Sequence, residues 1–205
     1  PGGATIMTTT SDSQQVREQL DHPVIDTDGH VQEFMPLVLP HLRESLGSEL
    51  FDEFVARPSP LSLIMGDEGV GGRIAARVPQ SAWWATPARN TRDLATAVLP
   101  RLLYERLDEF GIDFAVLFPS KALGMAGVPE PELRAGLCHG YNEFVAATYG
   151  GFSDRICAAG VLPMHTPDEA VAEIEHCRSL GLKVLGLPEG VYRRIPKPGA
   201  VDTPW

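Results

Sequence analysis

The chain has 205 residues, of which 43% are hydrophobic and 21% are charged, and its formal net charge is −10. This composition is typical of a globular protein, and the acidic balance argues against nucleic-acid binding because no basic stripe is present to neutralise phosphates. No apolar run approaches the roughly 18 residues of a membrane span, so we expect no membrane partner. The first residues are rich in Gly, Thr, Ser and Gln without the apolar core of a signal peptide. We expect a flexible tail over 1–20 in a cytoplasmic protein.

The first predicted strand ends in an acidic segment, Asp-Thr-Asp-Gly-His-Val-Gln-Glu at 26–33. Asp28 and His30 are two residues apart, so on an extended backbone their side chains leave on the same side. A carboxylate and an imidazole that converge in this way supply half of a site for a first-row divalent metal. The alternative is an ordinary strand end with a polar turn, in which Asp28 caps the segment that follows.

The segment from about 47 to 93 is irregular, with several prolines and a glycine-rich stretch. Loops this long inside a domain are usually functional or disordered. The position of this segment after the first strand predicts that it lies over the carboxyl face, as a lid or as a wall of a substrate pocket. Trp83, Trp84 and Arg89 lie in it and can bind a planar carboxylate by ring stacking and bidentate pairing. The alternative, which we favour, is that the tryptophans anchor the loop to the rest of the domain or to a second subunit.

The rest of the chain alternates apolar strands with amphipathic helices. Helices are predicted at 99–110, 129–149 and 166–180, and strands at 112–118, 155–162 and 182–187, the first of these strands buried on both faces. Such alternation predicts a parallel sheet, either open and doubly wound or closed into a β/α barrel. In both architectures the chemistry lies at the carboxyl ends of the strands, where Asp28 and His30 are expected.

Three further residues are candidates for the same edge of the sheet. Glu33 is either a partner that fixes the tautomer of His30 or the first residue of the next helix. Ser120 follows the second strand and His165 follows the third, so both are pocket candidates. For His165, a loop histidine without a role is the simpler interpretation.

The cysteines, the helical histidines and Asn142 are expected to have structural roles and not catalytic ones. Adjacent helix positions point about 100° apart, so His139 and its neighbouring cysteine do not form a catalytic pair. His176 falls on the polar side of its helix and is expected to be exposed, whereas Asn142 is expected to make a structural hydrogen bond. The cysteines are odd in number and far apart, which predicts buried free thiols at Cys138, Cys157 and Cys177.

The order and spacing of these segments resemble the amidohydrolase-related (amidohydrolase 2) family of metal-dependent β/α barrels, whose members include hydrolases and decarboxylases of carboxylic acids. The resemblance covers about 23–205 and is carried by 24–33, 101–113, 114–120, Tyr141-Asn142 and 154–170. It implies a (β/α)8 TIM barrel with one divalent ion, Zn or Mn, bound by Asp28 and His30. Many members have His at the first of these two positions, so Asp28 is a departure.

Length limits how much of a barrel this chain can form. A complete β/α barrel takes about 250 residues, whereas four strands are predicted in 205. We therefore expect the N-terminal part of a barrel over 21–205, with about the first four β/α units. The resemblance implies two further ligands, a His and an Asp, in later strands. The alternative is a complete small α/β domain with an open four-stranded sheet.

The resemblance implies a metal-dependent enzyme acting on a small carboxylic acid or amide, aromatic acids included. A hydrolase would use the metal to activate water and polarise a carbonyl, and a decarboxylase would use it to orient a carboxylate; the sequence leaves both open. We expect a small-molecule substrate and a homo-oligomer for the complete protein. The alternative for this chain is an inactive half-barrel or open-sheet module that acts only by association, since its edge strands would be exposed.

Overall fold

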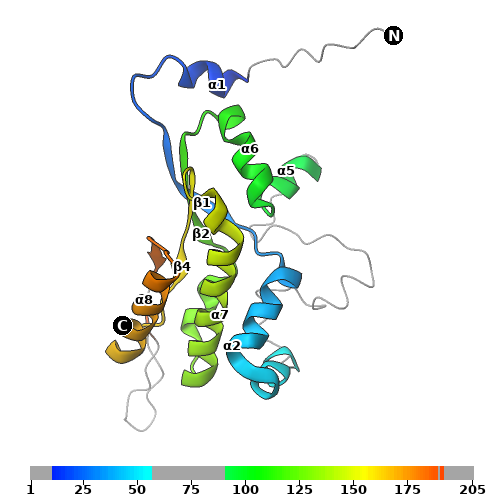
Figure 1. The fold of residues 1–205 in the computed structure, drawn as a ribbon, viewed down its shortest axis with the longest axis vertical. Coiled ribbons are helices and arrows are strands. Elements are labelled where there is room, and N and C mark those ends of the chain that lie inside the picture. Colours follow the sequence, from blue (N-terminus) through cyan, green and yellow to red (C-terminus); the bar gives the residue numbers. More distant parts are fainter. Residues whose placement is uncertain (1–10, 57–90, 189, 192–205) are drawn as a thin grey trace, which may run out of the picture.

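The computed structural model describes residues 11–56, 91–188, 190 and 191 (Figure 1). Trp83, Trp84 and Arg89 lie outside these ranges. The elements in chain order are α1 Asp12–Arg17, β1 Ile25–Val31, α2 Met35–Ala56, α5 Thr91–Thr96, α6 Pro100–Phe110, β2 Phe114–Pro119, η1 Ala122–Gly127, α7 Pro131–Tyr149, η2 Gly150–Phe152, β3 Ile156–Ala158, β4 Gly160–Val161, α8 Pro167–Ser179 and β5 Leu185–Gly186.

The strands are parallel and follow one another in chain order. β1, β2 and β3 form one sheet, and β4 pairs with β5 in a second. The predicted single strand at 155–162 is therefore wrong in detail: it changes partner at Ala159, whose N–H donates to the carbonyl of Leu117 at 2.8 Å. A doubly wound sheet reverses its strand order, whereas a barrel winds in one direction. The order β1-β2-β3 runs in one direction, as in a barrel, but the described strands do not form a closed barrel.

One face of the sheet is buried under helices and the other is not. The register pairs Ala115 with Ile156 and Leu117 with Ala158, and these four side chains are buried in a core that includes Leu107 of α6. The alternate residues of β2 are only half-buried. The expectation that this strand is buried on both faces is thus wrong for one face. The reason is that the described helices cover only one side.

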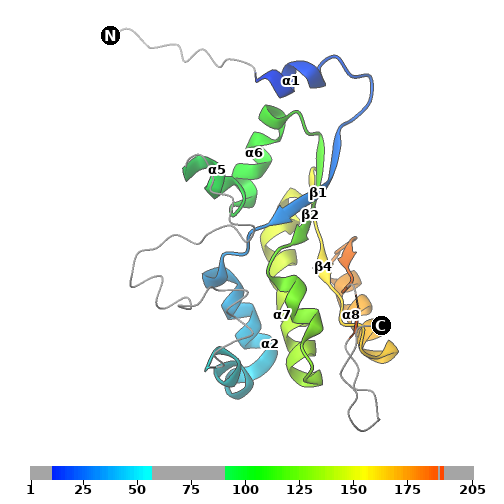
Figure 2. The same cartoon turned by 180° about the vertical axis from the view of Figure 1, so that it is seen from behind.

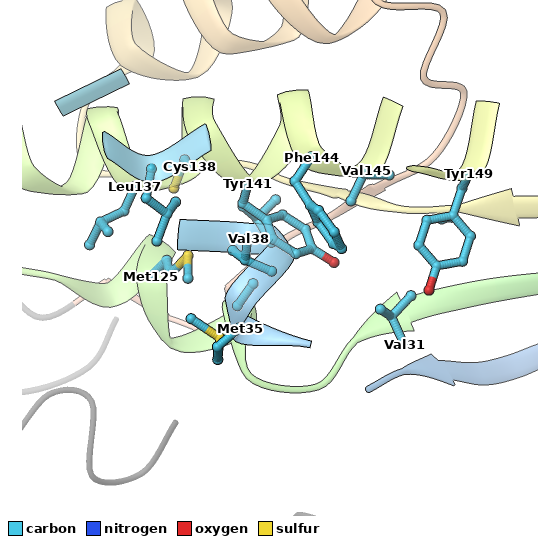
Figure 3. Close-up of a cluster of buried hydrophobic side chains, with 14 of the residues drawn as sticks. Val31, Met35, Val38, Met125, Leu137, Cys138, Tyr141, Phe144, Val145 and Tyr149 are labelled. Atoms are coloured by element: carbon cyan, nitrogen blue, oxygen red, sulfur yellow. The ribbon is translucent and has the colours of Figure 1, made fainter. Parts of the chain in front are cut away.

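Helices α2 and α7 lie side by side and enclose much of the core (Figures 1 and 2). Their close approach depends on Gly140, where an added Cβ would lie 2.8 Å from the carbonyl oxygen of His41. Figure 3 shows the apolar cluster between them, with Tyr141 and Phe144 of α7 beside Met35 and Val38 of α2. This packing holds α2, the helix that follows β1, against α7.

Two predicted irregular segments are partly helical. Residues 12–17, expected to belong to a flexible tail, form α1, which begins at the N-cap Ser11 and packs beside α6. Arg17 of α1 forms an ion pair with Asp113, in the turn between α6 and β2. Residues 47–56, expected to be irregular, continue α2 after a kink at Gly47, which has a φ of 72°. Both corrections arise from contacts or backbone angles that local composition does not encode.

None of the helices in the described ranges is long and apolar enough to cross a bilayer.

Candidate functional site

His30 lies at the carboxyl end of β1, paired in register with Phe118 of β2. It therefore shares the half-buried face of the sheet with Phe118. Its Nδ1 is 3.3 Å from the hydroxyl of Ser120, and that hydroxyl also accepts a hydrogen bond from the side-chain amide of Gln32 at 3.3 Å. If Nδ1 donates to Ser120, Nε2 keeps the lone pair that a metal needs.

Asp28 is exposed and lies within an irregularity of the strand. The pairing with β2 shifts between Asp26 and Gly29, and the backbone N–H of Asp28 donates to the Asp26 carboxylate at 3.0 Å. Gly29 is required by close packing, because an added Cβ would lie 2.6 Å from Leu117 Cδ2. Asp28 and His30 thus lie at the expected edge, and their role as metal ligands stays a prediction.

Glu33 joins the ends of β1 and β2. Its carboxylate accepts backbone hydrogen bonds from Ser120, Lys121 and Ala122 at 3.0–3.1 Å, and its side chain is almost fully buried. Burial raises the pKa of Glu33 above its ordinary value, and the N–H donors partly oppose this shift. Glu33 therefore fixes the backbone of Ser120, whose hydroxyl lies beside His30. The role expected for Glu33 in setting the tautomer of His30 stays a prediction.

The remaining pocket candidate, His165, follows β4 and is half-buried. Lys121, the residue after Ser120, is buried with its Nζ 3.4 Å from the carbonyl oxygen of Glu33. Asn142 makes the structural hydrogen bonds expected of it, bridging the N–H and the carbonyl of Val161 at 2.8 and 2.9 Å.

A cavity beside β1 is lined in part by a buried arginine, Arg106, which was not among the residues predicted from the sequence. The cavity is lined by Asp26 and His30 of β1 and by Arg106 of α6, among others. Arg106 is 5% exposed and binds Glu109 through two hydrogen bonds, and Asp93 through a third at 2.9 Å. These partners raise the pKa of Arg106, hydrogen bonding to Glu109 contributing most. In the sequence, Arg106 stands next to Leu107 on the buried side of α6, and a charged residue at such a position could have indicated a buried ion pair.

The three cysteines and the helical histidines differ in part from expectation. Cys138 and Cys177 are buried and free, as predicted, whereas Cys157 is only half-buried. Burial raises the pKa of all three thiols, to about 12 for Cys177, so they are poor nucleophiles at neutral pH. His176 was expected to be exposed, but its side chain is 18% exposed because α8 packs it against His139.

Comparison with known proteins relates this geometry to a fold. No family model and no curated protein matches the chain. The described structure is similar to the crystal structure of an amidohydrolase from Mycobacterium avium subsp. paratuberculosis K-10, with a TM-score of 0.54 and 17% identity over 84% of this chain. The fold is that of part of a solved amidohydrolase. The expected resemblance is therefore confirmed at the level of fold.

Two decarboxylases are also similar in structure, at lower TM-scores. The 5-carboxyvanillate decarboxylase of Novosphingobium aromaticivorans, solved with manganese and 3-methoxy-4-hydroxy-5-nitrobenzoic acid, has a TM-score of 0.47 and 18% identity over 84% of this chain and 44% of its own. The 2,6-dihydroxybenzoate decarboxylase from Rhizobium has a TM-score of 0.44 and 18% identity over 82% and 39%. This chain spans half of the amidohydrolase and less of the decarboxylases.

Proposed function

We propose that this chain forms the first β/α units of a (β/α)8 barrel belonging to a metal-dependent amidohydrolase-type enzyme. The observation that carries the proposal is the position of His30. It lies at the carboxyl end of a parallel strand, on the half-buried sheet face, with Nδ1 beside the Ser120 hydroxyl. This is the edge at which β/α barrels place their chemistry.

The residues present fit half of a metal site. Imidazole nitrogen and carboxylate oxygen are both ligands of zinc and manganese, so His30 and Asp28 supply two donor groups. Two donors from one strand do not complete a coordination shell. In the proposal, the remaining ligands come from later strands of the barrel, and the ion is Zn or Mn.

The chain's own residues hold and shape this half-site. Ser120 orients the His30 ring, and Glu33 fixes the backbone of Ser120 through buried hydrogen bonds. When bound, a divalent ion would polarise a carbonyl or carboxylate oxygen of the substrate and activate a water molecule. We propose a small carboxylic acid or amide as substrate, cleaved by hydrolysis or by non-oxidative decarboxylation.

Metal analysis of the parent protein tests the proposal. We expect stoichiometric zinc or manganese in the protein that contains this chain together with its later strands, and its loss on substitution of His30→Ala. His22→Ala, which removes an exposed histidine outside the site, is the control. Equal metal in the parent protein and the His30→Ala variant would contradict the proposed site, whatever the activity.

A second candidate role is favoured by the half-buried sheet face. Ile25 is paired with Phe114 on that face and is 54% exposed. A sheet face that no helix in the described part of the chain covers is suited to association, either with the rest of a barrel or with another copy. The second candidate is therefore an association module without activity of its own. Metal bound by this chain alone at His30 would argue against it.

A further inference from the structure

Two histidines on neighbouring helices form a polar cluster separate from the residues at the end of β1. His139 of α7 and His176 of α8 stack with ring centroids 3.6 Å apart and an interplanar angle of 19°. Glu143 lies one turn after His139, and its Oε1 is 3.4 Å from His176 Nε2. One potential ligand atom from each of the three residues lies within 4.8 Å of the other two.

The Nε2 atom of His176 is buried, and within the described part of the chain it has no hydrogen-bond partner. The Glu143 carboxylate is close to it, but among the described residues no group meets hydrogen-bond geometry with this nitrogen. Buried polar atoms in folded proteins almost always have a partner. A cation shared with the adjacent carboxylate would provide one.

Glu173 supplies the outer contact typical of a histidine that ligates a metal. Its carboxylate is 6% exposed, accepts a hydrogen bond from Asn142 Nδ2 at 2.7 Å, and lies 3.4 Å from His139 Nδ1. A carboxylate can only accept, so Nδ1 of His139 carries the proton in this contact and Nε2 keeps its lone pair. Carboxylate–histidine pairs of this kind orient metal-bound imidazoles.

We propose that His139, Glu143 and His176 form a divalent transition-metal site that joins α7 to α8, with Glu173 as a positioning residue. Two imidazoles and one carboxylate are the donor set of zinc-type ions, whereas magnesium prefers oxygen ligands alone. Because the rings are nearly parallel, one of them turns about its Cβ–Cγ bond so that both lone pairs meet at the ion. The bound ion ties α8 to α7.

Thermal unfolding of the 205-residue chain with zinc chloride or magnesium chloride tests the site. Zinc at about a hundredfold excess over its dissociation constant should raise Tm by roughly 5 °C or more, and magnesium should not. His176→Phe keeps a stacked ring without a ligand nitrogen, and Glu143→Gln keeps the shape of a half-exposed side chain. Both variants should lose the zinc-dependent rise and the visible absorption of tetrahedral cobalt(II).

Two control variants separate this site from the one proposed at β1. His30→Ala and His22→Ala should keep the full zinc-dependent rise, because neither residue belongs to the α7–α8 cluster. A rise that survives both His176→Phe and Glu143→Gln overturns the proposal, as does the absence of saturable zinc binding to the unaltered chain. A rise lost only in His30→Ala assigns the ion to the end of β1 and likewise overturns it.

Discussion

At the scale of single residues, Glu33 has the clearest structural role near the candidate site. It is the common acceptor for three successive backbone N–H groups at 120–122, all of them buried. Glu33→Ala leaves these donors unsatisfied, and a buried donor without a partner costs about 1–3 kcal/mol. We expect a loss of at least about 3 kcal/mol in the free energy of unfolding, measured by urea denaturation.

Glu33→Gln is the matched variant, because it keeps one acceptor oxygen in nearly the same shape. We expect it to lose clearly less stability than Glu33→Ala. Equal losses for the two variants would show that side-chain packing at Glu33, and not hydrogen bonding to 120–122, sets its contribution.

At the scale of helices, the crossing of α2 over α7 depends on glycine. Alanine at position 140 would place Cβ 2.8 Å from the His41 carbonyl oxygen, a backbone atom that moves only with its helix. Overpacking of this kind costs about 1–3 kcal/mol, partly offset by the roughly 1 kcal/mol that alanine gains over glycine in helix propensity. We expect Gly140→Ala to lower the free energy of unfolding, as measured by thermal or urea denaturation.

Gly136→Ala is the control for this prediction, since it lies one turn earlier on the same helix. Its added Cβ would meet the Leu46 side chain, with Cδ2 at 2.4 Å, and that side chain can rotate away. The helix-propensity gain is the same at both positions. A larger loss at Gly136 than at Gly140 would contradict the interpretation of the crossing.

The ion pair that holds α1 against the turn before β2, between Arg17 and Asp113, is expected to depend on pH. Hydrogen bonding by Arg17, and next by the backbone N–H of Val24, lowers the pKa of Asp113 below its ordinary value of 3.8. The stabilisation is therefore present above the ordinary pKa and is lost as the pH falls through the lower pKa of the folded state. The protection factors of the 12–17 amides, which compare the observed exchange with the intrinsic rate at each pH, should fall in that acid range. Asp113→Asn should show fast exchange at neutral pH and no such transition.

At the scale of the whole molecule, the half-buried face of the sheet predicts association, because none of the described helices covers it. Ile25 lies on this face and is 54% exposed. We expect the chain to associate in a concentration-dependent manner and Ile25→Lys to weaken that association, as measured by sedimentation velocity. Val55→Lys on α2 is the control, because Val55 is 45% exposed and lies outside the sheet. Equal weakening by both variants would contradict a role for this face.

The sequence by itself determined the alternation of strands and helices, because hydrophobic period and capping residues are local signals. Thr166 accepts a hydrogen bond from the Glu169 N–H at the start of α8, and Gly111 adopts a left-handed conformation at the end of α6. These residues mark the ends of the helices predicted at 166–180 and 99–110. The sequence also placed Asp28 and His30 at the carboxyl end of the first strand, since parallel β/α units bring that edge together.

Only the tertiary structure decided which residues meet across the chain. The Ser120 hydroxyl beside His30, the Glu33 carboxylate beneath 120–122 and the stacking of His176 on His139 all join segments far apart in sequence. Such contacts depend on strand register and helix crossing, which no local pattern specifies. The same holds for the one-sided burial of β2, which follows from which elements cover the sheet and not from the apolar run itself.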